Sequence, residues 1–301
     1  MNRKIYDGFL FFNELDLLEI RLNTLNDVVD YFILVESSVT HSGESKSFIF
    51  ENNKEKFSQF LDKIIHIKVT DTPNDFTNLP EFIPTNFDEK CIYDAYQYIK
   101  MTDNFNRFTQ PYYGRDFYQK ECIKRGMFSC ADNDIIILSD IDEIPNPEIL
   151  SRLNEFYSDD DMYTFNQTMY CYYFNLLCES HIDNSSHPYK VDSNWKGSRM
   201  SSFKNIKNYS FNLLRAQDNI DIINGGWHFS YMGGEERVKE KIKASSAIDW
   251  NNDYVINNIT TKLNNEQDVI NRGDKLIKVE IDESYPEYFI KNLNKFKYLI
   301  K

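Results

Sequence analysis

Residues 134–147 read Asp-Ile-Ile-Ile-Leu-Ser-Asp-Ile-Asp-Glu-Ile-Pro-Asn-Pro and give the first indication of the fold. The run Ile135–Leu138 is apolar without interruption and mostly β-branched. Such a run is typical of a strand buried on both faces, as in a largely parallel sheet covered by helices. Two prolines then prevent further strand pairing. This stretch therefore predicts an α/β protein.

Three acids, Asp140, Asp142 and Glu143, follow the apolar run. In an extended chain Asp140 and Asp142 point to the same side, at the carboxyl end of the strand, where open α/β sheets place their ligands. Carboxylates suit Mg²⁺ or Mn²⁺, which can hold a diphosphate. An Asp-x-Asp is also common in solvated loops, but the buried strand before it favours a metal–diphosphate site. We expect Asp142 to be exposed at the strand end.

The first seventy residues alternate strand and helix patterns. Strands are predicted at Ile5–Phe12, Tyr31–Val35 and Ile64–Val69, with helices beginning at Leu15 and covering Lys54–Phe60. A β-α-β-α-β order predicts a parallel sheet with right-handed crossovers.

The remaining chain is predicted to form one domain, residues 1–301, because no linker or repeat divides it. We expect a helix at Asp116–Met127, an aromatic strand at Met162–Tyr173, an irregular polar segment at Leu176–Lys207 and a terminal helix at Tyr285–Tyr298.

The composition excludes several classes of protein. A net charge of −13 argues against binding to nucleic acid or to an anionic membrane surface. No long apolar run predicts a membrane span, and no signal peptide is recognised. The five cysteines lack zinc-finger or Cys-x-x-Cys spacing, so we expect reduced thiols in a cytoplasmic protein.

A second dense segment contains Gly225-Gly226-Trp227-His228, followed by Gly233-Gly234-Glu235-Glu236. Paired glycines permit close approach of a ligand, and Trp227 and His228 offer a flat face and a neutral nitrogen. Transfer of a sugar by direct displacement needs a carboxylate base, which Glu235 or Glu236 can supply. Acids in the first turn of a helix are also explained by the helix dipole alone, and His228 by a purely structural role.

These motifs resemble glycosyltransferase family 17, which includes β-1,4-mannosyl-glycoprotein β-1,4-N-acetylglucosaminyltransferases. The matching segments follow the family order along almost the whole chain: Asn13–Arg21, Val29–Ser37, Asp140–Pro145, Gly226–Ser230 and Tyr285–Tyr298. Two departures stand out. Lys120 occupies the place where an arginine is expected, and Ala247 the place of a histidine.

The resemblance implies a GT-A-like fold, a UDP-sugar donor (UDP-N-acetylglucosamine as the first guess), a glycan acceptor, Mn²⁺ or Mg²⁺, and inversion at the anomeric carbon. Residues 1–145 are then the nucleotide-sugar half, and residues 146–301 the acceptor and base half. Asp142 becomes the direct metal ligand, and Asp140 reaches the metal through water or contacts the donor ribose. Glu236, more than Glu235, falls on the family's acid. Without a membrane anchor, we expect a bacterial or viral enzyme working in the cytoplasm, that of the host if viral.

The other expected site residues each have a structural alternative. Glu36 and Lys120 are expected at the donor, although Glu36 can equally hold the Thr40–Gly43 loop. Arg215 can neutralise the diphosphate or form a surface ion pair. Trp195 and Trp227 can stack on sugars together with His228 at the acceptor, or pack in the core.

Two competing functions remain from the sequence. One is a non-catalytic carbohydrate-binding protein that kept the fold, which would bind donor without turnover. The other is a metal-dependent phosphatase built on Asp-x-Asp, which the mid-chain position of the motif and Glu143 after it disfavour.

Overall fold

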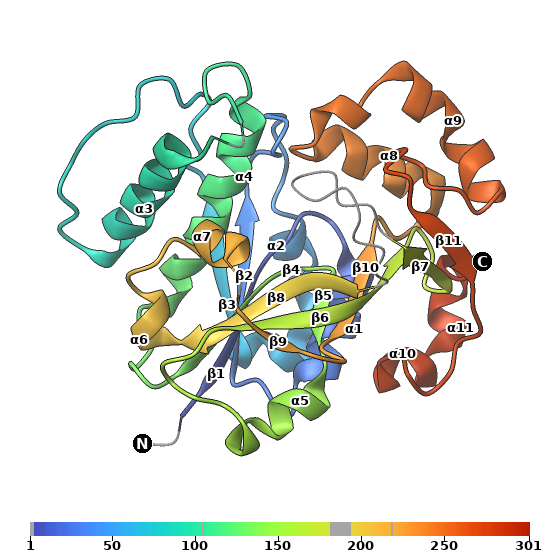
Figure 1. The fold of residues 1–301 in the computed structure, drawn as a ribbon, viewed down its shortest axis with the longest axis horizontal. Coiled ribbons are helices and arrows are strands. Elements are labelled where there is room, and N and C mark those ends of the chain that lie inside the picture. The colour runs from blue at the N-terminus through green and yellow to red at the C-terminus, as the bar shows by residue number, and fades with distance from the viewer. Residues whose placement is uncertain (1–2, 104, 181–193, 218) are drawn as a thin grey trace.

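The computed structural model describes residues 3–103, 105–180, 194–217 and 219–301 (Figure 1). Its strands are β1 (Ile5–Leu10), β2 (Tyr31–Ser37), β3 (Ile64–Val69), β4 (Ile135–Asp140), β5 (Glu143–Pro145), β6 (Tyr163–Cys171), β7 (Leu176–Ser180), β8 (Asn194–Ser202), β9 (Ile220–Ile222), β10 (Gly226–Ser230) and β11 (Lys275–Lys278). Its α-helices are α1 (Leu15–Leu25), α2 (Ile49–Asn53), α3 (Phe87–Met101), α4 (Pro111–Glu121), α5 (Pro147–Ser151), α6 (Phe203–Ile206), α7 (Phe211–Ala216), α8 (Gly234–Ala244), α9 (Asp253–Asn264), α10 (Glu287–Lys291) and α11 (Leu293–Phe296).

The strands form one sheet in the order β11-β7-β6-β8-β4-β1-β2-β3, with β9 and β10 paired to β6 and β5 paired to β10. The half β4-β1-β2-β3 is parallel, as expected from the β-α-β-α-β pattern. Beyond β4 the sheet is mixed, because β8 runs antiparallel to β4 and to β6, and β7 antiparallel to β6. Only residues 172–175 join β6 to β7, and so short a connection allows only an antiparallel pair. The expectation of a mostly parallel sheet therefore holds for the N-terminal half.

Strand β4 lies between β1 and β8 and is buried on both faces. Ile135 and Ile137 pack into the same core as the α1 face that carries Leu18. Ile136 and Leu138 point to the opposite face, against a second core that includes residues of α3 and α4. This alternation explains why the apolar run has no polar interruption.

The irregular segment expected at Leu176–Lys207 instead contains β7, β8 and α6; residues 181–193 lie outside the described residues. Strand β8 is polar in sequence but buried, because its polar groups find partners inside the protein. The hydroxyls of Ser201 and Ser202 each donate to a backbone carbonyl at 2.7 Å. The Arg199 guanidinium donates to the backbone carbonyls of Leu214 and Arg215 in α7. It also donates to the carbonyl of Lys196, three residues earlier in β8. Hydrophobic periodicity cannot identify a strand stabilised in this way.

The predicted C-terminal helix is divided into α10, α11 and a short 3₁₀ turn at Lys297–Leu299. The Asn-rich segment before it contains α9, and the Asn252 side chain caps this helix by accepting a hydrogen bond from the Val255 amide. No helix in the described part of the chain is both long and apolar enough to cross a membrane.

Figure 1 shows α3 with α4 on one side of the molecule and α8 with α9 on the other. The carboxyl end of β4 opens between α4 and α8, since residues of both helices line the same cavity as Asp140. This arrangement positions the candidate site.

Candidate active site

A cavity of about 360 Å³ lies at the carboxyl ends of β1, β2 and β4. Its lining combines residues of β10, α4 and α8 with the turn after β4. Asp140 and Asp142 both line it, as do the predicted residues Lys120, Trp195 and His228. The fold thus brings segments from both halves of the chain to the edge of the sheet where ligands bind in α/β proteins.

Asp142 is buried, not exposed as expected from the sequence, with only 5% of its surface accessible. Its Oδ2 accepts a hydrogen bond from the Lys241 ammonium at 2.6 Å, and its Oδ1 lies 3.7 Å from Nε2 of His228. Burial alone would raise the pKa of Asp142, but Lys241 and His228 outweigh it and hold the pKa below its ordinary value. Asp142 is therefore ionised at neutral pH.

Asp140 is more accessible and faces two cations. Its carboxylate oxygens lie 3.7 Å from Nζ of Lys120 and 3.5 Å from Nη2 of Arg215. Lys120 also pairs with Asp116, four residues before it on α4, at 3.1 Å. Lys120 thus lies beside the acidic turn, and its predicted contact with the donor remains a prediction.

Glu143 is the residue whose role the sequence did not reveal. It is buried, and its two oxygens accept hydrogen bonds from Arg215 at 2.7 and 2.9 Å and from the Trp195 indole at 2.7 Å. The amide of Asp140 donates to the same carboxylate at 3.1 Å. Burial raises the pKa of Glu143, but Arg215, His228 and the Trp195 indole together hold it well below its ordinary value. Glu143 therefore orients Arg215, Trp195 and the acidic turn together.

We expect Glu143→Gln to lower the free energy of unfolding by about 2 kcal/mol, because hydrogen bonds to charged groups contribute about 1.5–3 kcal/mol. Urea denaturation monitored by tryptophan fluorescence measures this change. The matched control is Glu148→Gln, which changes an exposed acid just beyond the same turn and should leave the midpoint unchanged. Equal midpoints for the two variants would contradict the orienting role of Glu143.

Arg21 stabilises the acidic turn from the protein interior. It is fully buried and donates two hydrogen bonds to Asp7, at 2.6 and 2.7 Å. Its remaining nitrogen, Nη1, donates to the backbone carbonyls of Asp140, Ile141 and Glu143 at 3.2, 3.3 and 2.6 Å. Arg21 therefore connects the acidic turn to the buried carboxylate of Asp7.

His228 and Trp195 form one wall of the cavity. Their rings lie 4.8 Å apart, inclined at 34°. Burial lowers the pKa of His228, more than the nearby carboxylates raise it, so the ring is neutral at pH 7. Both residues line the cavity, and their contacts with an acceptor remain a prediction.

Trp227 and Glu36, by contrast, do not line the cavity. Along β10, Trp227 points opposite to His228 into the core, and its indole donates to the carbonyl of Ser284 at 2.8 Å. Glu36 is completely buried and accepts hydrogen bonds from the Phe50 amide and Lys46. The core-packing alternative therefore holds for Trp227, and a structural role holds for Glu36.

Glu235 and Glu236 are both exposed in the first turn of α8, and neither lines the cavity. The cavity-facing side of α8 carries Lys241, and a residue five positions earlier lies about 140° away around a helix. The predicted base at Glu235 or Glu236 therefore finds no support in this arrangement. The acids there fit the alternative of stabilising the amino end of the helix.

Sequence reasoning also missed His41 and Asp116, which line the cavity beside Lys120. Nε2 of His41 lies 3.9 Å from Asp116, whose other oxygen accepts a hydrogen bond from Ser246 at 2.9 Å. The spacing of Asp116 and Lys120 by four residues on one helix face was the available signal. Nothing in the local sequence connects them to His41 or Ser246.

Whether a divalent cation fits the cavity depends on the ligand atoms that its lining residues offer. Two carboxylates, Asp140 and Asp142, face one cavity, and the Lys241 ammonium shows that Asp142 accepts a positive charge there. Within the described residues no third acid, histidine or cysteine joins them in a tight cluster of possible ligand atoms. One or two carboxylates, completed by phosphate oxygens and water, are the usual protein share of a Mg²⁺ site. The residues therefore fit Mg²⁺ or Mn²⁺ bound together with a diphosphate.

An α/β sheet with an acidic turn at its ligand-binding edge, flanked by cations, is the kind of site that binds a nucleotide diphosphate. Residues 1–82 match the family model described as Glycosyltransferase family 17. This match to the N-terminal 82 residues supports the resemblance to a glycosyltransferase family that the sequence motifs indicated. It covers β1 to β3 and ends before the acidic turn, so the roles of Asp140 and Asp142 remain predictions. A comparison with curated proteins gave no match.

Proposed function

We propose that the protein transfers a sugar from a UDP-sugar, with UDP-N-acetylglucosamine as the first candidate, to a hydroxyl group of a glycan acceptor with inversion. The observation that carries this proposal is the cavity at the end of β4, where Asp140 and Asp142 lie among three cations. The match of the N-terminal region to a glycosyltransferase family supports the same reaction class.

The three cations, Lys120, Arg215 and Lys241, surround the acidic turn and suit the charge of a diphosphate. Arg215 donates both Nη1 and Nη2 to Glu143, which holds the guanidinium and its positive charge beside Asp140. Lys120 and Lys241 provide point charges on opposite walls of the cavity, from α4 and α8. Together they favour a nucleoside-diphosphate leaving group.

Asp142 and Asp140 would hold the metal, Mn²⁺ or Mg²⁺. When bound, the metal supplies positive charge that stabilises the leaving diphosphate. Arg21 holds the turn that presents both carboxylates. Lys241 has Glu14 as a second partner at 3.2 Å, so binding of a metal at Asp142 does not leave its ammonium without a counter-ion.

One observation favours the second candidate, a carbohydrate-binding protein without turnover: the predicted base lies outside the cavity. Two measurements, donor binding and release of UDP, separate the two functions. Calorimetric titration with UDP-sugars, with and without Mn²⁺, should show binding of one donor only when metal is present. Release of UDP on addition of glycan acceptors then identifies a transferase, whereas metal-dependent binding without UDP release identifies the binding protein. Absence of binding by every UDP-sugar would contradict both.

We expect Glu236→Gln to keep transfer within about threefold of the unchanged protein, because its side chain is exposed and points away from the cavity. A general base contributes about 10²–10⁴-fold, so the two cases are well separated. Steady-state release of UDP measures the effect, with Glu235→Gln as the matched control. If Glu236→Gln alone lowered the rate of UDP release by about a hundredfold, Glu236 would be the catalytic base, as predicted from the sequence.

A further inference from the structure

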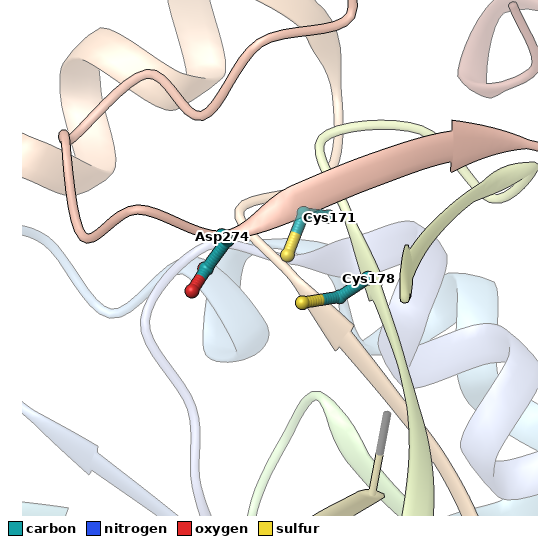
Figure 2. Close-up of side chains that lie close together, drawn as sticks. All are labelled: Cys171, Cys178 and Asp274. Atoms are coloured by element: carbon teal, nitrogen blue, oxygen red, sulfur yellow. The ribbon is translucent and has the colours of Figure 1, made fainter. Parts of the chain in front are cut away.

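Away from the acidic turn, cysteines of β6 and β7 meet an aspartate that lies just before β11 in the interior. Figure 2 shows the sulfur atoms of Cys171 and Cys178 beside each other, with Asp274 next to them. Their possible ligand atoms all lie within 4.8 Å of one another, and all three residues are buried. We propose that Cys171, Cys178 and Asp274 bind one zinc ion, which joins β6, β7 and β11.

The strand register explains why the three side chains converge. Tyr170 of β6 is paired with Leu177 of β7, so Cys171 and Cys178, one position further along their strands, both point to the other face of the sheet. Cys178 is paired with Leu276 of β11, and Asp274 lies just before that strand. The site therefore depends on pairing between segments about a hundred residues apart in sequence, which local Cys spacing does not reveal.

The distances suit a tetrahedral ion. A Zn–S bond of about 2.3 Å places two sulfur ligands roughly 3.8 Å apart, and a carboxylate oxygen slightly closer. An atom spread below 4.8 Å therefore closes around zinc with movements of about 1 Å. Three protein ligands leave a fourth position for water.

The register disfavours a disulfide between the same cysteines. Because Tyr170 pairs with Leu177, Cys171 and Cys178 are diagonal neighbours across the two strands. Diagonal positions have Cα atoms about 7–8 Å apart, whereas a disulfide requires less than about 7 Å. A metal can connect thiolates at this separation without moving the backbone.

The charges also balance around a divalent cation. Two thiolates and one carboxylate carry three negative charges, and Arg272 supplies one positive charge, with Nη2 2.7 Å from Asp274 and 3.9 Å from Sγ of Cys171. A divalent ion makes the buried group neutral, and its binding releases the two thiol protons to solvent. Soft sulfur ligands select zinc here, whereas the oxygen ligands of Asp140 and Asp142 select Mn²⁺ or Mg²⁺.

Zinc at this site would also act on the cavity. Arg272 lines the cavity near Tyr231 and is held by its ion pair with Asp274. Fixing Asp274 to β6 and β7 therefore fixes the guanidinium at the cavity wall. The zinc site does not depend on the proposed transferase activity.

The test uses the full chain, reduced, stripped of metal with a chelator and titrated with Co²⁺ and then Zn²⁺. Thiolate ligands give Co²⁺ an intense near-ultraviolet charge-transfer band, which carboxylate ligands at Asp140 and Asp142 do not produce. We expect this band at one equivalent of Co²⁺ and its loss when Zn²⁺ displaces cobalt. Cys171→Ser and Cys178→Ser should each weaken zinc binding by at least about a hundredfold, since even changes behind a ligand cost about ten- to a hundredfold.

Two controls separate this site from the rest of the protein. Cys130→Ser changes a cysteine outside the cluster and should keep the band, as should Asp142→Asn, which changes only the acidic turn. A reduced wild-type chain without the band would overturn the proposal whatever the variants do. So would a Cys171–Cys178 disulfide that forms in air while added zinc remains unbound.

Discussion

Replacing Arg21 by methionine is expected to lower the free energy of unfolding by about 3–5 kcal/mol, the usual cost of removing one partner from a buried ion pair. The variant leaves Asp7 charged and fully buried, without the guanidinium that now donates two hydrogen bonds to it. It also removes the donor to three carbonyls of the acidic turn. Urea denaturation followed by circular dichroism measures the loss.

Two further variants test the physical reason. Adding Asp7→Leu to Arg21→Met should recover part of the lost stability, because no buried charge is then left unpaired. Lys54→Ala removes an exposed partner of Glu51 and should leave the midpoint unchanged. A loss below about 1 kcal/mol in Arg21→Met would show that the turn does not depend on Arg21.

The second large effect is expected at Asp142. Asp142→Asn should weaken metal-dependent binding of the UDP-sugar by about a hundredfold or more, since a bound metal contributes several kcal/mol to a developing charge and each 1.4 kcal/mol is a factor of ten. Calorimetric titration with the donor, in Mn²⁺ and in chelator, measures the metal-dependent part.

Because Asp142 is buried and paired with Lys241, its replacement also reduces stability, and the two effects must be separated. Lys241→Met breaks the same ion pair at a similar loss of stability but keeps the carboxylate. It removes one cation beside the diphosphate, so it should weaken donor binding with and without metal alike and keep the gain in affinity that Mn²⁺ provides. Asp221→Asn, at an exposed acid of β9, should change neither quantity. Metal-dependent binding at full strength in Asp142→Asn would remove Asp142 from the metal site.

The elements that the sequence predicted well are those whose interactions are local or follow one strong pattern. The uninterrupted apolar run of β4 identified a central strand because both of its faces are buried. The two carboxylates after it were assigned to one side of the chain, and they do line one cavity. The resemblance placed Lys120 at the donor, and its ammonium lies 3.7 Å from the carboxylate of Asp140.

The predictions that failed concern the direction of a side chain in three dimensions. Trp227 and His228 are adjacent, yet alternation along β10 sends one to the core and the other to the cavity. Glu236 follows paired glycines as expected, but the rotation of α8 turns it toward solvent and Lys241 toward the site. Asp142 is buried because α8 covers the turn with Lys241.

By itself, the sequence determined the α/β class, the central strand, the acidic turn at its end and the resemblance to a glycosyltransferase family, because each of these depends on neighbouring residues or on motifs in order. Only the tertiary structure decided that Arg21 and Glu143 hold the turn, that Arg215 and Lys241 face it, and that two cysteines meet Asp274. These contacts join residues dozens to more than a hundred positions apart. Their geometry depends on strand register and helix rotation, and packing of the whole chain sets both.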